Sequence, residues 1–259
     1  KPSSPSGGGR LCAYFLASAR LLKYDSGTDM KRISLIVPCL NEEEAIPAFK
    51  QEIDRVFKEC LEGYAPELIF VDDGSTDRSL EMIKKMAEHS PEVKFISFSR
   101  NFGKEAAIYA GLEAATGDYA AVMDVDLQDP PSLLPDMLKA IEKEGYDCAG
   151  TRRVTRQGEP LLRSFFARAF YKTIHQISDT RIVDGARDYK LMTRPVLEAL
   201  LSLKEYNRFS KGLYEWVGFR TKWFEYENVE RVAGETKWSF FKLFLYLSLI
   251  HISEPTRPY

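Results

Sequence analysis

The sequence predicts an α/β domain in which a mostly parallel β-sheet carries helices on both faces. Short continuous apolar runs, typical of strands buried on both faces, alternate with amphipathic helical stretches from Ile33 to Lys143. Groups of acidic and polar residues follow three of these runs. The 259 residues suffice for one large domain with a small appendage. We expect the domain to span residues 30–232.

The expected elements alternate between strand and helix. The run Ile33–Val37 stops at Pro38, and the stretch after it places apolar side chains on one helical stripe. Strand–helix–strand connections of this kind give right-handed crossovers and parallel strands. The inward stripe of that first helix comprises Ile46, Phe49, Ile53, Val56, Phe57 and Cys60. We expect strands at Ile33–Val37, Leu68–Val71, Val93–Phe98, Tyr119–Met123 and Asp147–Gly150, and helices at Glu43–Cys60, Arg78–Glu88, Lys104–Ala115 and Ser132–Lys143.

Composition excludes some classes of protein. The chain is 44% hydrophobic and 29% charged with a net charge of −2, whereas a nucleic-acid-binding protein would usually have a basic excess. The four cysteines are scattered and form no C-x-x-C pair, which predicts reduced thiols in a cytosolic compartment. These cysteines are Cys12, Cys39, Cys60 and Cys148.

Both ends of the chain differ from the predicted domain. Residues 1–29 open with a Pro/Ser/Gly stretch, and we expect them to be upstream or foreign sequence. The stretch Ser239–Ile252 is apolar but shorter than the roughly 20 residues that a bilayer span needs. We expect residues 233–252 to be a membrane-proximal segment that begins a truncated transmembrane region, and residues 253–259 to be a foreign or disordered tail.

The amphipathic stretch Leu161–Ile177 has two interpretations. Its apolar face alternates with basic residues that include Arg163. It could be a core helix with a solvated basic face, or a basic helix lying on anionic lipid.

Three apolar runs end in acidic or polar residues that a buried sheet does not need. In parallel sheets, ligands bind beyond the carboxyl ends of the strands, so three such loops at one edge favour a binding site over turns alone. The loops are Pro38-Cys39-Leu40-Asn41-Glu42, Asp72-Asp73-Gly74-Ser75-Thr76-Asp77 and Asp124-Val125-Asp126-Leu127-Gln128-Asp129.

The spacing of Asp124, Asp126 and Gln128 predicts a metal site. Side chains two residues apart in an extended chain point the same way, so these oxygens could converge on one cation. Such ligands suit Mg²⁺ or Mn²⁺, commonly held together with substrate phosphates. The sequence contains neither G-x-G-x-x-G after the first strand nor a P-loop, so a dehydrogenase and a P-loop NTPase fit poorly.

Five motifs follow one another in order from about Lys31 to Leu247: ISLIVPCLNEEE, VDDGSTDRS, SRNFGKEAAIYAGL, MDVDLQDPP and AGETKWS. This ordered set resembles glycosyltransferase family 2, which has the GT-A fold. Within the family the sequence is similar to the polyprenyl-phosphate branch of dolichol-phosphate mannose synthases and bactoprenol glucosyltransferases. The resemblance implies a Rossmann-like GT-A domain followed by C-terminal amphipathic, membrane-proximal helices.

The resemblance also implies roles for individual residues. Asp124, Asp126 and Asp188 match catalytic positions, and Gln128 completes the metal site with the first two. Lys104 matches a donor contact, although it could equally be a solvated residue in the first turn of a helix. Arg187 stands where many relatives have a small residue. The nucleotide pocket would comprise Pro38, Asn41, Glu42, Asp72 and Asp73 with Lys104 and Asp124, and the phosphate and acceptor contacts would be Arg152, Arg163, Arg187, Arg208 and Lys237.

The implied activity is an inverting sugar transfer that uses Mg²⁺ or Mn²⁺. The donor would be a nucleotide sugar, with UDP-glucose favoured, and the acceptor undecaprenyl phosphate at the cytoplasmic face of the membrane. A homo-oligomer of the full-length protein would be compatible with this activity. Two alternatives stay open: a transferase acting on a sugar hydroxyl, with Asp188 as the base, and a catalytically silent nucleotide-binding scaffold.

Overall fold

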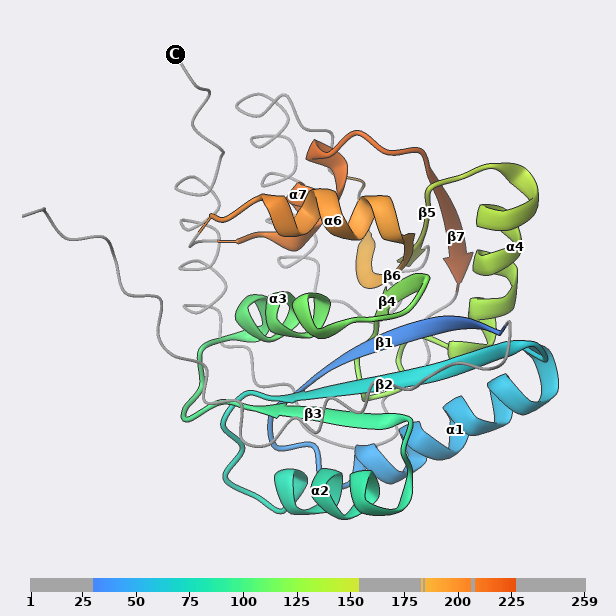
Figure 1. Cartoon of the computed structure of the whole chain (residues 1–259). Helices are drawn as coiled ribbons and strands as arrows, with labels where there is room; N and C mark the ends of the chain where they lie inside the picture. Colours follow the sequence, from blue (N-terminus) through green and yellow to red (C-terminus); the bar gives the residue numbers. More distant parts are fainter. Residues whose placement is uncertain (1–29, 154–182, 184, 206–207, 227–259) are drawn as a thin grey trace, which may run out of the picture.

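The computed structural model describes residues 30–153, 183, 185–205 and 208–226. In this part of the chain a seven-stranded sheet lies between two layers of helices (Figure 1). The strands are β1 (Lys31–Cys39), β2 (Tyr64–Asp72), β3 (Val93–Ser97), β4 (Tyr119–Val122), β5 (Cys148–Arg153), β6 (Ala186–Thr193) and β7 (Thr221–Tyr226). The helices are α1 (Ala45–Cys60), α2 (Ser79–His89), α3 (Lys104–Ala114), η1 (Pro131–Leu133), α4 (Leu134–Glu144), α6 (Arg194–Ser202) and α7 (Ser210–Trp216).

The strand order is β3-β2-β1-β4-β6-β5-β7. Strands β3, β2, β1 and β4 pair in parallel, and β5 pairs in parallel with β7. Strand β6 runs antiparallel to both of its neighbours, β4 and β5. Because β6 runs the opposite way, its first residues lie at the edge where β1, β2 and β4 end.

The two faces of the sheet bury separate apolar cores. Leu35 and Val37 of β1 pack toward α1, α2 and α4, whereas the intervening Ile36 packs toward α3, α6 and α7. This alternation follows from the two-residue period of a strand, and it explains why a strand covered on both faces is apolar throughout. The expected mostly parallel sheet with helices on both faces is therefore confirmed.

The sequence patterns predicted strands β1 to β5 and the helices between them, but not the elements that follow β5. Each expected strand and helix up to Gly150 is present, with ends shifted by a few residues. Strands β6 and β7 and helices α6 and α7 were not predicted as separate elements. Cys60 was expected on the inward stripe of α1, but it is exposed because it is the last residue of the helix. Cys39 and Cys148 are buried free thiols.

Several expectations fall on parts of the chain outside the described residues. They concern residues 1–29, the stretch Leu161–Ile177 and residues 233–259. Within the described part of the chain, none of the helices has both the length and the apolar character needed to cross a bilayer.

A buried polar network joins the strands in the amino-terminal half of the sheet. The Glu67 carboxylate in β2 accepts hydrogen bonds from Ser34 in β1, from Lys94 Nζ at 2.5 Å, and from the backbone N–H and hydroxyl of Thr116 at 2.9 and 2.6 Å. Glu67 is almost fully buried, so these partners replace the water that its charge would otherwise require. This network is structural, because it lies away from the edge where β1, β2 and β4 end.

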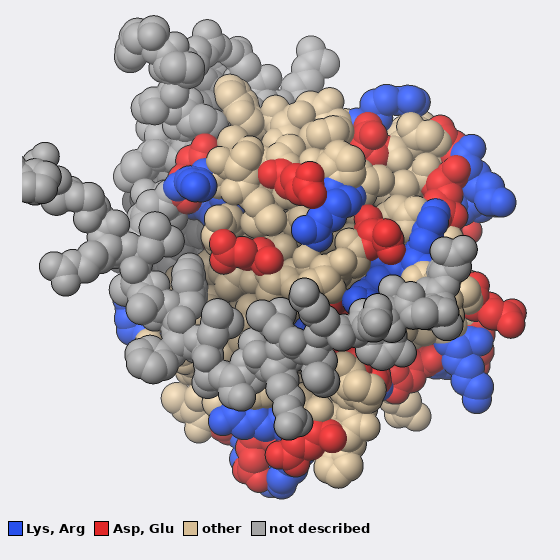
Figure 2. All heavy atoms as spheres, in the orientation of Figure 1, with Lys and Arg blue, Asp and Glu red and all other residues tan. Residues whose placement is uncertain are grey.

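The visible surface shows no large area of one charge. In Figure 2 the Lys and Arg atoms and the Asp and Glu atoms of the described residues are interspersed on this face, with neutral surface between them. Among the described residues, oppositely charged side chains form ion pairs, such as Arg55 with Glu52 and Glu59, and Lys222 with Glu144. Such a surface agrees with the net charge of −2.

Candidate active site

The loops that follow β1 and β2 are tied to each other through Asn41. Its side-chain oxygen accepts a hydrogen bond from the Thr76 backbone N–H at 2.7 Å, and its own backbone N–H donates to Ser75 Oγ at 2.9 Å. Asn41 has a φ of 52°, a left-handed conformation that asparagine tolerates better than most residues. Glu42 adds a further link, since its backbone N–H donates to Ser79 Oγ at 2.8 Å. The two loops thus form one rigid wall.

The paired carboxylates after β2 hold neighbouring loops in place. Asp72 accepts the Ser75 backbone N–H at 3.2 Å and the Ser97 hydroxyl at 3.3 Å. Asp73 accepts the backbone N–H groups of Phe102 at 2.7 Å and Gly103 at 3.0 Å. Burial raises the pKa of the Asp73 carboxyl, and these two N–H groups oppose part of that shift. Asp73 therefore positions the loop that leads into α3.

Gly74 allows this loop to come close. It has a φ of +75°, and a Cβ at this position would lie 2.5 Å from the backbone carbon of Arg100. Only glycine combines that conformation with so close an approach of two backbones.

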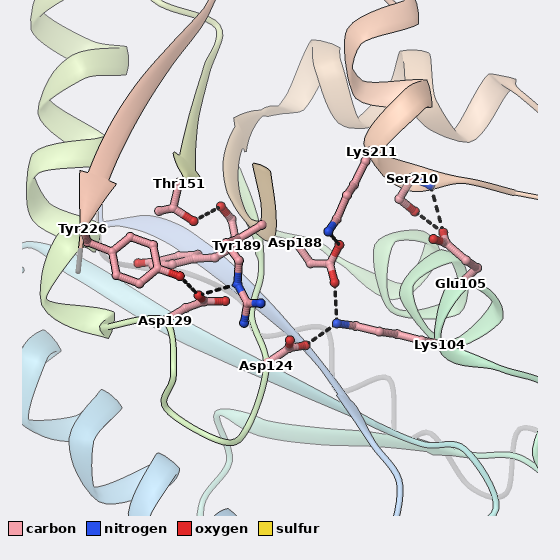
Figure 3. Close-up of polar contacts among 11 residues, drawn as sticks. Lys104, Glu105, Asp124, Asp129, Thr151, Asp188, Tyr189, Ser210, Lys211 and Tyr226 are labelled. Carbon is pink, nitrogen blue, oxygen red and sulfur yellow. Dashed lines mark hydrogen bonds and ion pairs between the residues drawn. The ribbon is translucent and has the colours of Figure 1, made fainter. Parts of the chain in front are cut away.

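Lys104, the first residue of α3, lies between two carboxylates (Figure 3). Its ammonium is 2.6 Å from Asp124 Oδ1, just after β4, and in contact with Asp188 Oδ2 in β6. Asp188 Oδ1 is also 3.6 Å from Lys211 Nζ in α7. The structure thus brings together the predicted residues Lys104, Asp124 and Asp188, from elements far apart in the sequence.

These contacts shift the pKa values of Lys104 and Asp188. Burial alone would lower the pKa of Lys104, but the Asp124 and Asp188 carboxylates outweigh it and the net shift is upward. Burial alone would raise the pKa of Asp188, yet Lys104 and Lys211 hold it well below its usual range. Lys104 and Asp188 are therefore both charged at neutral pH.

Asp126 and Gln128 lie in a tight turn after Asp124. Asp126 is largely buried, and its Oδ1 accepts the Gln128 backbone N–H at 3.2 Å across Leu127, which has a φ of 56°. Among the described residues, no three Asp, Glu, His or Cys side chains are grouped so that they alone could hold a metal ion. The convergence of Asp124, Asp126 and Gln128 on one cation stays a prediction.

Asp129 anchors the other side of the site. Its side chain is fully buried, and its Oδ1 accepts a hydrogen bond from Arg187 Nε at 2.9 Å. The same oxygen accepts a hydrogen bond from the Tyr226 hydroxyl, as Figure 3 shows. Burial alone would lower the pKa of Arg187, but Asp129 together with Tyr226 and Asp124 outweighs it, and the net shift is upward. The other predicted arginine in this region, Arg152, pairs at the surface with Glu225 on the neighbouring strand.

Two further predicted residues can be placed. Pro38 lies within β1, one residue before the strand ends. Arg208 donates to the carbonyl oxygens of Leu200 and Leu203 at the end of α6, and it lies over the Tyr109 ring. Binding a phosphate would require Arg208 to exchange these partners. Arg163 and Lys237 lie outside the described residues.

Sequence reasoning missed two contributors to the site. Lys211 faces Asp188, and Glu105 accepts the Ser210 backbone N–H at 3.0 Å and its hydroxyl at 2.5 Å, which joins α3 to the start of α7. The only indication that Glu105 belongs to the site was its position next to Lys104 at the start of a predicted helix. Nothing indicated that Lys211 does, because α7 itself was not predicted.

Comparisons with known proteins identify the family to which the chain belongs. The model of the family described as Glycosyl transferase family 2 matches residues 34–201. The chain is 45% identical over 214 residues to CsbB of Bacillus subtilis, a protein named as a glycosyltransferase, covering 83% of this chain and 64% of that protein. It is 42% identical to the prophage bactoprenol glucosyl transferase homolog of Escherichia coli, covering 82% of this chain and 68% of that protein. The chain thus spans about two thirds of the length of these relatives.

Among solved structures, the chain is similar to the mannosyltransferase PcManGT from Pyrobaculum calidifontis in complex with GDP-Man and Mn²⁺. The TM-score is 0.54 at 20% identity, with 89% of this chain and 67% of that one covered. At this identity the likeness concerns the fold, and it agrees with a GT-A domain. The family match over residues 34–201 and the identity to the bacterial relatives show that the chain belongs to glycosyltransferase family 2.

Proposed function

We propose that this chain is an inverting glycosyltransferase that moves glucose from UDP-glucose to a polyprenyl phosphate at the cytoplasmic face of the membrane. The observation that carries the proposal is the charge arrangement at the site, where Lys104 and Lys211 neutralise Asp188 and Lys104 also contacts Asp124. A similar protein from Escherichia coli is named as a bactoprenol glucosyl transferase homolog, which supports this donor sugar and acceptor.

The state of Asp188 favours a phosphate acceptor over a sugar hydroxyl. A hydroxyl acceptor needs a general base, and an efficient base has a pKa close to the working pH. Lys104 and Lys211 outweigh burial and hold the pKa of Asp188 well below its usual range, so this carboxylate is a weak base. A phosphate is already anionic near pH 7 and needs positioning rather than deprotonation. We therefore assign Asp188 the role of holding the two lysines.

The residues after β4 suit a divalent metal ion. Asp124 and Asp126 supply carboxylate oxygens and Gln128 an amide oxygen, a set that hard cations such as Mg²⁺ and Mn²⁺ accept. Asp124 Oδ1 already faces a cation, the ammonium of Lys104. When bound, the metal would neutralise charge on the leaving diphosphate. The Mn²⁺ in the PcManGT complex supports a divalent metal here too.

The chain's own residues would contribute mainly binding and orientation. The wall formed by Asn41, Asp72 and Asp73 would border the nucleotide, and Lys104 would contact its diphosphate. Arg187, oriented by Asp129, would contact the acceptor phosphate. Holding two mutually repelling anions in line for attack at the anomeric carbon is the costly step, and fixed positive groups lower that cost. A single displacement inverts the anomeric centre.

A radiolabel assay tests the acceptor. The protein is incubated with UDP-[¹⁴C]glucose, Mn²⁺ and either undecaprenyl phosphate or undecaprenol, which differ only in the phosphate. We expect label in the lipid fraction with the phosphate alone. Label transferred to undecaprenol or to soluble sugars would favour the hydroxyl-acceptor alternative. Mn²⁺-dependent UDP binding without turnover on any acceptor would favour the silent scaffold.

A thermal-shift screen tests the donor. UDP-glucose, UDP-N-acetylglucosamine and GDP-mannose are compared with Mn²⁺ present, because a ligand that binds the folded state raises Tm by mass action. The largest shift is expected for UDP-glucose. A larger shift for GDP-mannose would refute the proposed donor while leaving the acceptor open.

A further inference from the structure

The ammonium of Lys104 contacts Asp124, the same carboxylate that would bind the proposed metal ion. It is 2.6 Å from Asp124 Oδ1, a distance typical of a strong charge-assisted hydrogen bond. About a third of the Lys104 side chain is exposed, so it can leave this position without unpacking the core. Figure 3 shows that it reaches Asp124 from α3, with Asp188 on its other side.

The dipole of helix α3 disfavours a positively charged side chain at its first residue. Lys104 is the first residue of α3, where the positive end of the helix dipole repels an ammonium. The residue before it, Gly103, has a φ of 100° and provides no side-chain cap. Attraction to the two carboxylates therefore holds the side chain, and a competing anion could draw it elsewhere.

We propose that Lys104 is an exchangeable counter-ion of Asp124: a divalent cation displaces it, and the donor diphosphate receives it, so that cation and donor bind synergistically. This inference rests on the proposed function, because it requires a metal-dependent nucleotide donor.

The charges in contact with Lys104 explain the synergy. Lys104 neutralises Asp124 and, together with Lys211, Asp188. A divalent cation held by Asp124 and Asp126 would displace the Lys104 ammonium from Asp124 and repel it. The diphosphate of a nucleotide sugar carries about two negative charges near pH 7, so it would give both the cation and the displaced ammonium an anionic partner, and each ligand would favour the binding of the other. Lys211 stays on Asp188 when Lys104 moves, so Asp188 keeps a partner.

The loop before α3 links Lys104 to Asp73, one of the residues proposed to border the nucleotide. Asp73 accepts the backbone N–H groups of Phe102 and Gly103, the two residues immediately before Lys104. The base of the Lys104 side chain is thus fixed to the loop that would border the nucleotide, and only the flexible end of the side chain has to move.

The experiment measures Mn²⁺ binding by electron paramagnetic resonance of free Mn²⁺, with and without saturating UDP. In the wild type, UDP should strengthen Mn²⁺ binding. In Lys104→Met, Mn²⁺ affinity without UDP should rise about tenfold or more, and the enhancement by UDP should shrink correspondingly. Lys104→Arg, which keeps the cation, should bind Mn²⁺ without UDP about as weakly as the wild type.

Lys222→Met is the matched control. Lys222 lies near the start of β7 and pairs with Glu144 at 2.6 Å, away from Asp124 and Asp188, so its loss should leave both the Mn²⁺ affinity and the synergy with UDP unchanged. If Lys104→Met bound Mn²⁺ without UDP no more tightly than the wild type, the exchange would be refuted while the metal site stood. If the wild type bound no Mn²⁺ even with UDP, the proposed function would fail and the exchange with it.

Discussion

Replacing Asp129 with alanine should destabilise the fold strongly, because it leaves a largely buried guanidinium without its carboxylate. Asp129 is fully buried, whereas the Arg187 side chain retains 23% of its exposure. Breaking a fully buried ion pair by removing one partner costs about 3–5 kcal/mol. Since water can reach part of Arg187, we expect about 2–4 kcal/mol, which includes the lost hydrogen bond of the Tyr226 hydroxyl.

The surface pair Arg152–Glu225 provides the control. It joins neighbouring strands of the same part of the sheet, but its side chains are 42% and 49% exposed. Glu225→Ala should therefore cost no more than about 1 kcal/mol. Asp129→Asn keeps an oxygen acceptor but loses the charge, and its cost should fall between the two.

Urea unfolding followed by circular dichroism measures these costs. For a chain of this size, a loss of about 2–4 kcal/mol corresponds to a fall in Tm of roughly 5–15 °C. If Asp129→Ala cost no more than Glu225→Ala at an unchanged m-value, the buried cluster would contribute nothing to stability and the reasoning would be wrong.

Three further predictions concern the site and the sheet. Asp126→Ala should lower lipid-linked glucose formation by at least about 100-fold with a Tm within a few degrees of the wild type, and retained turnover would contradict its assignment as a metal ligand. The hydrogen bonds from Lys94, Ser34 and Thr116 outweigh burial and lower the pKa of Glu67 from 4.5, so its stabilisation is present above pH 4.5 and lost as the pH falls further. The stability difference between wild type and Glu67→Gln in urea should therefore shrink from pH 6 to pH 3, and a constant difference would refute this account. Gly74→Ala should lower the free energy of unfolding by about 2–4 kcal/mol, because the added Cβ would clash with the backbone of Arg100. Gly145 has a similar φ of +74° but open space around it, so Gly145→Ala should cost only about 1 kcal/mol. Equal losses of stability in thermal melts would show that the close approach of Gly74 to Arg100 is unimportant.

The sequence predicted the parallel half of the sheet because local patterns determine it. Strands buried on both faces contain continuous apolar runs, and Leu35–Val37 in β1, Leu68–Val71 in β2 and Tyr119–Val122 in β4 fit that pattern. Strand β6 does not, because it carries Arg187, Asp188 and Lys190 among its eight residues. Lys190 is nevertheless buried, since it is 3.2 Å from Glu215 and lies over the rings of Tyr214 and Trp223. Those partners come from α7 and β7, so no local pattern could reveal that this lysine belongs to a strand.

The candidate site was predictable to a similar extent. Residues that follow apolar strands, such as Asp73 and Asp124, could be identified because parallel strands end at one edge. Their partners could not. That Lys104 would lie between Asp124 and Asp188, or that Lys211 would lie beside Asp188, depends on β6 entering the sheet in the reverse direction between β4 and β5.

The pairing of β4 with β6 also determines where relatives of this chain could exchange segments. Tyr119–Val122 and Lys190–Thr193 join the first half of the domain to the second through main-chain hydrogen bonds, which do not depend on side-chain identity. A chimaera joined in the loop between β4 and α4 would retain this seam. If the proposed function holds, it would combine the proposed nucleotide-binding residues of one parent with the proposed acceptor-binding residues of another, so that the two specificities could be inherited separately.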